Sequence, residues 1–359
     1  MKIAFFDTKP YDCPGFEQCA NEYNSTLSAG GSSDGQKIEL KFYETKLSED
    51  TVGLAEGADC VCVFVNDVVN AAVIDRLYEY GVRLIALRCA GYNNVDVEHC
   101  YGRIHVVHVP AYSPYAVAEH AMALLLTSIR RIHKGYIRTR EFNFSLNNLT
   151  GFDLHGKTVG IIGTGRIGRV FADICKGFGM NIIAYDKFPA PDSGLHYSVL
   201  DKLFRESDII SLHCPLTEET HHMINADSIG KMKTGVVLIN TSRGALVDAE
   251  ALLSGIKDRK IGAACLDVYE EESDIFFHDY SGHIMADDVL ARLISMPNVI
   301  VTSHQAFLTK EALENIAETT INNILEFVDN GYSQNELCYK CGSIEKLASC
   351  KEGEPHKCF

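Results

Sequence analysis

Apolar segments of strand length alternate with amphipathic segments of helical length along nearly the whole chain. This alternation is typical of parallel sheets covered by helices. In the first third of the chain, five apolar segments predict the strands of one small open α/β sheet: 2–6, 38–43, 60–65, 83–87 and 104–109. The segment from Asn21 to Gln36 is rich in Ser, Gly and Asn and predicts a surface loop.

A second series of alternating strands and helices begins at Lys157. Six further strands are predicted at 158–162, 181–185, 209–212, 236–239, 263–266 and 299–302. Six strands are enough for a doubly wound dinucleotide-binding fold. Two long helices frame this series, one beginning at Pro114 after a capping Ser113 and one running over 310–330 and ending at Gly331.

Composition and charge exclude some classes of function. The chain has 359 residues, enough for two domains, and a formal net charge of −15, which argues against a nucleic-acid-binding surface. We expect no membrane span and no secretory leader, because the apolar segments are short. Most of the 13 cysteines lie singly within apolar segments, which favours a reducing compartment and therefore the cytoplasm.

A glycine-rich turn predicts the cofactor site. Gly163, Gly165 and Gly168 lie between a predicted strand and a predicted helix, and Asp186 ends the next strand. This spacing permits a tight turn and places a pyrophosphate at a helix N-terminus. An acidic residue at the position of Asp186 binds ribose hydroxyls and would repel a 2′-phosphate, so NAD is favoured over NADP, although the neighbouring Lys187 offers a phosphate some attraction.

Four polar residues follow the ends of predicted strands, where ligands bind in open α/β sheets. They are Arg243, Asp267, Glu272 and His304. Each also has an ordinary interpretation: Arg243 could pair with Asp248, Glu272 lies in an acidic run that is typical of a solvated face, and a lone histidine is usually not catalytic.

Their common placement fits hydride transfer to a 2-keto acid. Such a reaction needs a proton donor at the carbonyl oxygen and a cation for the substrate carboxylate. An imidazole such as that of His304 suits the donor, and an adjacent carboxylate such as Glu272 would orient the ring and favour its protonated form. The planar guanidinium of Arg243 matches a carboxylate bidentately.

With these residues in place, the sequence resembles the D-isomer-specific 2-hydroxyacid dehydrogenases over about residues 1–337. The stretches that carry the resemblance are FVND, IALRCAGYNNVD, VPAYSPYAVAEHA, RRIHKGYIRTR, IGTGRIG, SLHCPLT, NTSRGAL, LDVYEEES, SDIFF and SHQAFLT. Within the family, the chain is most similar to the fermentative branch that interconverts pyruvate and D-lactate.

The resemblance implies roles for individual residues. Arg243 would bind and polarise the substrate, Glu272 would hold His304, and His304 would donate the proton. Substrate-binding residues implied in the same way are Ala90 and Gly91 through their backbone amides, and Tyr112 and Phe307. Cofactor contacts implied beside the glycines and Asp186 are Arg166, Ile167, Cys214, Pro215, Thr241 and Asp267.

The family also implies the domain organisation. A Rossmann NAD-binding domain, 110–306, would be inserted into a smaller flavodoxin-like substrate domain formed by 1–109 and 307–337. A cysteine-rich tail, 338–359, lies outside the family pattern; its spacing offers no recognisable metal-binding scaffold, and we expect no metal there. By analogy with the family, the protein is expected to be a homo-oligomer.

Two alternatives stay open. One is a dehydrogenase for a different acid, such as glyoxylate, hydroxypyruvate, 3-phosphoglycerate or a branched 2-keto acid; formate dehydrogenases are disfavoured because that branch has glutamine where this chain has Glu272. The other is an NAD-sensing binding protein similar to the corepressors that share this fold.

Overall fold

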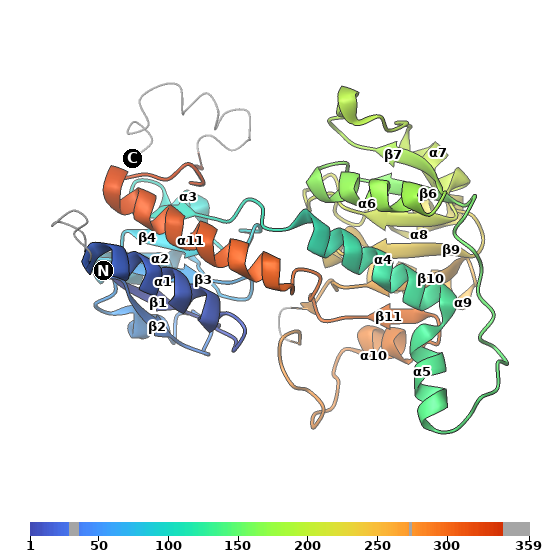
Figure 1. Ribbon diagram of the computed structural model, residues 1–359, viewed down its shortest axis with the longest axis horizontal. Helices are drawn as coiled ribbons and strands as arrows, with labels where there is room; N and C mark the ends of the chain where they lie inside the picture. The colour runs from blue at the N-terminus through green and yellow to red at the C-terminus, as the bar shows by residue number, and fades with distance from the viewer. Residues whose placement is uncertain (29–35, 273–274, 340–359) are drawn as a thin grey trace. The chain divides into compact units, whose positions relative to one another are not determined.

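The computed structural model describes residues 1–28, 36–272 and 275–339. These residues form two compact units, one containing Met1–Ser113 and the segment from Thr309 onward, the other containing Pro114–Leu308 (Figure 1). The predicted tail lies outside the described residues except for Cys338 and Tyr339. None of the described helices is long and apolar enough to cross a bilayer.

The first unit contains a five-stranded parallel sheet in the order β2-β1-β3-β4-β5. Its strands are β1 (Lys2–Phe5), β2 (Glu39–Phe42), β3 (Cys60–Val63), β4 (Leu84–Leu87) and β5 (His105–Val107). Around them lie α1 (Cys13–Ser28), α2 (Ala71–Glu79), α3 (Val97–Cys100), α11 (Lys310–Asn330) and the short 3₁₀ helix η1 (Val52–Ala55). All five predicted strands are confirmed, and this strand order is the flavodoxin-like one.

Helix α1 corrects one prediction, because it continues to Ser28 where we expected a loop from Asn21 onward. The hydroxyl of Ser25 donates to the Asn21 carbonyl oxygen at 2.7 Å, so a side chain typical of loops is satisfied within the helix. Asn24 bonds both the amide and the carbonyl oxygen of Ile38 and thereby fixes the end of the helix beside β2.

The second unit contains a six-stranded parallel sheet in the order β11-β10-β9-β8-β6-β7. Its strands are β6 (Thr158–Ile162), β7 (Asn181–Tyr185), β8 (Ile209–Leu212), β9 (Val236–Asn240), β10 (Ile261–Leu266) and β11 (Val299–Val301), which confirms the second predicted series. A single parallel bridge between Ala184 and Tyr197 adds a rudimentary strand outside β7. With this bridge the order is that of the Rossmann fold.

Helices cover both faces of this second sheet (Figure 1). Side chains of α4 (Pro114–Arg130) and α6 (Arg166–Gly177) pack on one face in one apolar core. A second core on the other face includes side chains of α7 (Leu200–Glu206), α8 (Ala226–Lys231), α9 (Ala249–Lys257) and α10 (Asp288–Ser295). Along β9, Val237 and Ile239 belong to the first core and Val236 and Leu238 to the second. A strand covered on both faces is apolar at nearly every position, and this is the pattern that made the strands predictable.

Both predicted long helices are present. Helix α4 begins at Pro114, and α11 spans Lys310–Asn330. Gly331 follows α11 with a left-handed φ of 78°, and its amide donates to the Phe327 carbonyl oxygen at 2.7 Å. This end is the αL cap that the glycine predicted.

Candidate active site

The glycine turn between β6 and α6 is shaped to receive a pyrophosphate. Gly163 has a φ of +93°, and a Cβ there would lie 2.5 Å from the Cys214 amide nitrogen, so only glycine fits. In contrast, a Cβ built on Gly165 would have no atom within 4 Å, which leaves open space beside the start of α6. Gly165 provides no side-chain cap, so the first amides of α6, beginning with those of Arg166 and Ile167, offer free N–H groups to an anion. The turn therefore fits the phosphates of a dinucleotide.

Asp186 lies at the end of β7, beside this turn. Its Oδ2 accepts hydrogen bonds from the Thr164 amide at 2.6 Å and the Thr164 hydroxyl at 2.9 Å, and its Oδ1 accepts one from the Phe188 amide at 2.8 Å. The Thr164 hydroxyl also lies 2.9 Å from the Tyr197 hydroxyl. These contacts hold the carboxylate in one orientation beside the glycines, and the sequence had not singled out Thr164 or Tyr197.

The phosphate-attracting role considered for Lys187 is weakened by its surroundings. Its ammonium group lies 2.6 Å from a carboxylate oxygen of Glu219, in an exposed ion pair. A carboxylate at Asp186 would repel a 2′-phosphate, so both residues favour NAD.

Three further predicted cofactor contacts follow β8 and β9. Cys214 is buried, and burial raises the pKa of its thiol to about 11, so it is a neutral apolar side chain. The Pro215 carbonyl oxygen accepts a hydrogen bond from the Thr220 hydroxyl at 2.8 Å. The hydroxyl of Thr241 is buried without a hydrogen-bond partner among the described residues, and it is therefore available to a bound ligand.

His213 lies beside the glycine turn, and we expect it to make the stability of this unit depend on pH. The half-buried His213 ring packs against Phe171 and lies 2.9 Å from the Ser211 hydroxyl, and its removal from solvent lowers its pKa from 6.5 to about 4. The unfolded chain therefore binds a proton that the folded chain does not. This stabilisation is complete above about pH 6.5 and is lost as the pH falls toward 4.

We expect the free energy of unfolding to fall by about 3 kcal/mol over this interval because of His213 alone. The measurement is urea unfolding followed by circular dichroism between pH 7 and pH 4. The His213→Asn variant should be less stable than the wild type at pH 7, with the difference shrinking by that amount at pH 4. A difference that is independent of pH would contradict the assignment.

The predicted contact between His304 and Glu272 is present. The Nδ1 atom of His304 lies 2.7 Å from Oε1 of Glu272, and both side chains are about one-fifth exposed. The second oxygen of Glu272 accepts a hydrogen bond from the Tyr269 amide at 2.8 Å, so the carboxylate is fixed on both sides. Glu272 is thus not a member of a solvated acidic face. With Nδ1 held by Glu272, the Nε2 atom is the one left to exchange a proton with a substrate.

Asp267, at the end of β10, organises the loop that carries His304. Its carboxylate is fully buried and accepts hydrogen bonds from the Thr302 hydroxyl at 2.6 Å and from the amides of Gln305 and Ala306 at 2.9 and 2.8 Å. The ring of His120 lies 3.2 Å away. Burial opposes ionisation of Asp267, but these hydrogen bonds outweigh it and hold its pKa below the usual value. The contact of Asp267 with a cofactor stays a prediction, and its observed partners give it a positioning role.

The backbone at His304 is strained, with a left-handed φ of 52°. The His304 amide donates to the carbonyl oxygen of Asp267 at 2.7 Å, which keeps the residue in this conformation. Such strain is tolerated where the surroundings over-determine the conformation, and it is common at functional sites.

Arg243 follows β9, the strand next to β10 in the sheet. Its Nη1 donates to the Ser242 carbonyl oxygen at 2.7 Å, and its own carbonyl oxygen accepts a hydrogen bond from the Asn240 side chain at 2.8 Å. Asp248 caps α9 through the Ala251 amide, and no ion pair between Asp248 and Arg243 is found among the described residues. Because β9, β10 and β11 are adjacent and parallel, Arg243, Glu272 and His304 all follow the same edge of the sheet.

The predicted substrate contacts belong to both units. Phe307 is buried in the second unit, and Tyr112 is half-buried in the first. Ala90 and Gly91 follow β4 in the first unit, where their carbonyl oxygens accept contacts from His108 Nδ1 at 3.0 Å and from the Cys89 thiol at 3.2 Å. Within the described part of the chain, their amides have no acceptor, so both N–H groups are available to an anionic ligand.

Comparisons with known proteins show the family to which the chain belongs. Residues 122–306 match the family model described as D-isomer specific 2-hydroxyacid dehydrogenase, NAD binding domain. A D-lactate dehydrogenase of Escherichia coli is 46% identical over 94% of this chain and 100% of its own length. The pyruvate reductase of Chlamydomonas reinhardtii has a similar structure, with a TM-score of 0.83, 42% identity and coverage of 92% of this chain and 97% of the other.

A D-lactate dehydrogenase from Aquifex aeolicus, solved in complex with NAD and lactic acid, matches with a TM-score of 0.78 and 33% identity over 97% of this chain and 98% of its own. Full-length similarity at these identities shows more than a shared fold. It places the glycine turn and the strand-end residues in the context of one enzyme family. The chain belongs to the D-isomer-specific 2-hydroxyacid dehydrogenases and is an NAD-dependent oxidoreductase.

Proposed function

We propose that the protein is a D-lactate dehydrogenase that reduces pyruvate to D-lactate with NADH. The observation that carries the proposal is the 2.7 Å contact between His304 and Glu272 at the strand edge that Arg243 also follows. A proton donor, its orienting carboxylate and a guanidinium are the groups that reduction of a 2-keto acid requires.

The side chains divide the work of this reaction. When bound, NADH supplies a hydride to the carbonyl carbon of the substrate. Arg243 binds the carboxylate of the 2-keto acid and attracts the electron pair of the carbonyl oxygen. His304 delivers its Nε2 proton to that oxygen, and Glu272 stabilises the ring before the transfer and keeps its orientation afterward. In the reverse direction His304 accepts the proton of the hydroxyl group.

The remaining predicted contacts set specificity. Ala90 and Gly91 offer amides to the substrate carboxylate, and Tyr112 and Phe307 are the proposed neighbours of the substrate side chain. A methyl group suits aromatic neighbours better than the polar side chain of hydroxypyruvate, because an unpaired hydroxyl in apolar surroundings loses its hydrogen bonds with water.

A steady-state comparison of substrates tests the function. We would measure kcat/KM for pyruvate, 2-ketobutyrate, glyoxylate and hydroxypyruvate with NADH and with NADPH, and determine the chirality of the product. The expected result is that kcat/KM is highest for pyruvate with NADH and that the product is D-lactate. A higher kcat/KM for another acid would mean that this acid, and not pyruvate, is the preferred substrate. Cofactor binding without turnover of any acid would indicate an NAD-sensing binding protein.

Arg243→Lys is expected to raise KM for pyruvate and to lower kcat, with kcat/KM falling by about 10²-fold. A lysine provides a point charge, which cannot form the two parallel hydrogen bonds of a guanidinium. Steady-state kinetics together with the dissociation constant for NADH make the measurement. An unchanged KM for pyruvate would mean that Arg243 does not bind the carboxylate.

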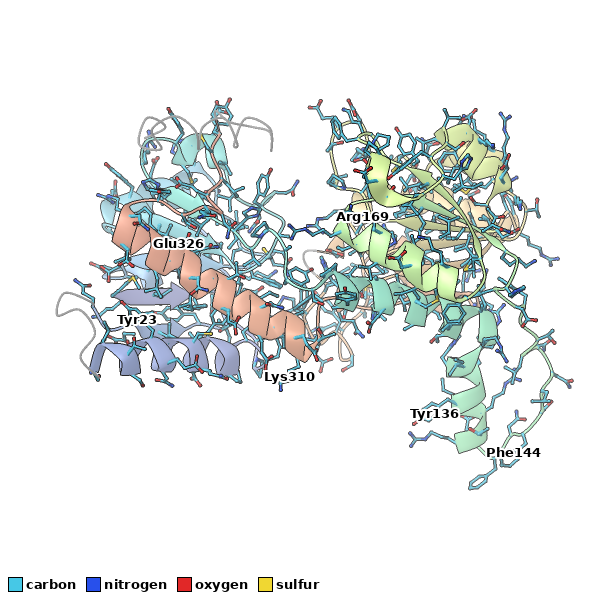
Figure 2. All side chains as sticks on the ribbon, turned by 45° about the horizontal axis from the view of Figure 1, so that its top comes forward. Tyr23, Tyr136, Phe144, Arg169, Lys310 and Glu326 are labelled. Atoms are coloured by element: carbon cyan, nitrogen blue, oxygen red, sulfur yellow. The ribbon has the colours of Figure 1, made fainter. Side chains whose placement is uncertain are left out.

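We also propose that the protein is a homo-oligomer whose contacts include an exposed apolar arm, residues 132–146. The arm consists of α5 (Ile132–Arg140) and the following loop, which extend from the rest of the second unit (Figure 2). Helix α5 has no buried residue, and Phe142 and Leu146 are 84% and 80% exposed. An exposed apolar surface of this extent is typical of an interface, and a second copy of the same chain is the usual partner in soluble oligomers.

Replacing Phe142 and Leu146 together by Ser is expected to weaken self-association at least 10-fold while the unfolding temperature of the separated subunits is unchanged. Sedimentation velocity over a range of protein concentrations measures the effect. Ile284→Ser is the matched control, because Ile284 is at least as exposed, at 94%, and lies outside the arm. Equal association of the arm variant and the control would exclude the arm as an interface.

A further inference from the structure

Three side chains that can bind metals converge in the second unit, apart from the residues assigned to catalysis. They are His221, His222 and Glu270, and their ligand atoms all lie within 4.8 Å of one another. Nε2 of His222 contacts Oε1 of Glu270, and the two side chains are 33% and 26% exposed. His221 is exposed. The cluster is therefore reachable from solvent, yet two of its three members are held in place.

The backbone orients the two histidines toward the same side. In an extended segment, consecutive side chains point to opposite faces. His222 has a left-handed φ of 48°, and the rings of His221 and His222 stack with centroids 3.9 Å apart and an interplanar angle of 24°. The His222 amide donates to the Ala245 carbonyl oxygen at 2.9 Å, and the His222 carbonyl oxygen accepts a hydrogen bond from the Asn225 side chain, also at 2.9 Å. These bonds fix the strained residue from both sides.

Glu270 is oriented by a contact of its own. Its Oε2 accepts a hydrogen bond from the Ala249 amide at 3.4 Å, at the start of α9, and Oε1 faces His222. A ligating carboxylate is commonly held in this way by a hydrogen bond to its other oxygen. Only the partner of Oε1 would have to change when an ion enters.

We propose that His221, His222 and Glu270 form a binding site for a divalent ion of the zinc class. Two imidazoles and one carboxylate are a preferred ligand set for Zn²⁺, with a water as the fourth ligand. Bond lengths of about 2.0–2.1 Å place tetrahedral ligand atoms roughly 3.4 Å apart. The ligand atoms of these three side chains lie no more than 4.8 Å from one another, so small side-chain movements would bring them to that spacing. An ordinary ion pair would need only His222 and Glu270. A metal site also explains why His221 lies with its ligand atom close to both of them.

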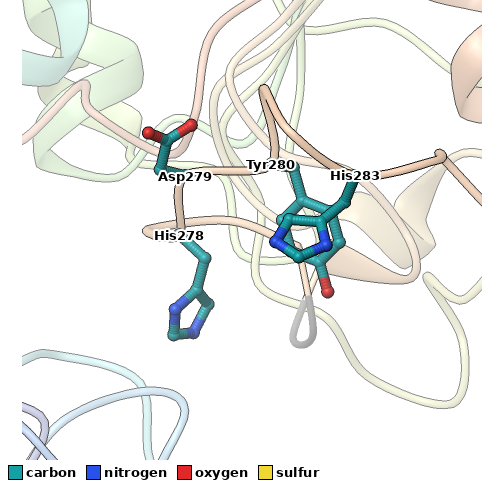
Figure 3. A pocket seen from close by; sticks show the side chains of 4 residues that line it. All are labelled: His278, Asp279, Tyr280 and His283. Atoms are coloured by element: carbon teal, nitrogen blue, oxygen red, sulfur yellow. The ribbon is translucent and has the colours of Figure 1, made fainter.

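A second group of residues of types that can bind metals lies close together without forming such a site. His278, Asp279, Tyr280 and His283 line a hollow of about 340 Å³ in the loop that follows Glu272 (Figure 3). The ring of His283 packs edge-on against Tyr280 with centroids 5.6 Å apart. Among the described residues, His278, Asp279 and His283 do not bring their ligand atoms together as the proposed site does. This hollow therefore provides a matched control.

An ion at the proposed site would connect three segments of the second unit. His222 is bonded to Ala245, two residues beyond Arg243, and Glu270 lies two residues before Glu272. The site thus connects the loop after β8 with the segments that carry Arg243 and Glu272. Occupancy is expected to raise the unfolding temperature, because an ion that binds only the folded chain stabilises it.

Direct metal binding by the full chain tests the proposal. Co²⁺ serves as a spectroscopic probe for Zn²⁺ in a buffer containing a non-chelating phosphine reductant, because the chain also has 13 cysteines. We expect one Co²⁺ site whose visible absorption is typical of nitrogen and oxygen ligands and which shows no charge-transfer band from a thiolate. We also expect His221→Gln to weaken this site at least 10-fold without changing the unfolding temperature of the metal-free protein.

The control is the double variant His278→Gln/His283→Gln, which is expected to bind Co²⁺ as tightly as the wild type. Glu270→Gln, which keeps a hydrogen-bonding side chain but removes the charge, should weaken binding as His221→Gln does. Binding that is unaffected by His221→Gln, or that shows only thiolate coordination, would overturn the proposal and leave His222 and Glu270 as an ion pair. Absence of any Co²⁺ binding would overturn it equally.

Discussion

Replacing His304 by Gln is expected to lower turnover by about 10²–10⁴-fold, the range that a positioned general acid contributes. Glutamine can still donate a hydrogen bond to Glu272 but cannot transfer a proton to the carbonyl oxygen. The dissociation constant for NADH should change by less than about twofold, because the dinucleotide fits the glycine turn and Asp186 rather than the imidazole. Single-turnover reduction of pyruvate and fluorescence titration with NADH measure the two quantities.

The left-handed backbone at residue 304 calls for a second variant. Asparagine adopts positive φ more readily than glutamine, so His304→Asn separates the missing proton from backbone strain. Both variants should lose turnover equally. Recovery of most of the activity in His304→Asn would mean that strain and not proton transfer explains the loss, and near wild-type turnover in either variant would exclude His304 as the donor.

The strands and long helices were predictable because burial leaves a simple pattern. Strands such as β9 are covered on both faces, so the positions from Val236 to Ile239 are all apolar. Helix α11 is followed by a glycine that adopts the left-handed conformation. The end of α1 was not predictable in this way. Ser25 and Asn24 are typical of loops, and their helical placement depends on contacts such as the bond from Asn24 to Ile38, 14 residues away.

The candidate site shows the same limit. The glycine turn and Asp186 were predicted from spacing, because a local strand–turn–helix unit determines their geometry. Spacing could not show that His304 contacts Glu272, because the two residues are 32 positions apart. Their placement after strand ends suggested the pair, and the family resemblance implied the contact. Thr164, Tyr197 and His120 were missed because common polar residues acquire a role only when the fold places them against Asp186 or Asp267.

Gly244→Ala is expected to disrupt the active site without touching a catalytic side chain. A Cβ on Gly244 would lie 2.0 Å from the carbonyl carbon and oxygen of Tyr269 and 2.4 Å from the Glu270 amide nitrogen. These are backbone atoms that cannot rotate away, so the segment after Arg243 and the segment leading to Glu272 must separate. Overpacking of this kind costs about 1–3 kcal/mol, and a displacement of about 1 Å at a reacting group can cost 10²-fold in rate.

We therefore expect Gly244→Ala to lower kcat/KM for pyruvate by at least about 10²-fold and the free energy of unfolding by about 1–3 kcal/mol. Gly230→Ala is the matched control: it lies within α8, a Cβ there meets no atom within 4 Å, and alanine favours a helix over glycine. This control should keep full activity and gain up to about 1 kcal/mol of stability. If Gly244→Ala lost stability but kept its kcat/KM, the contact between residues 244 and 269 would stabilise the fold alone. The positions of Arg243 and Glu272 would then have to be fixed by their own hydrogen bonds, those to the Ser242 carbonyl oxygen and from the Tyr269 amide.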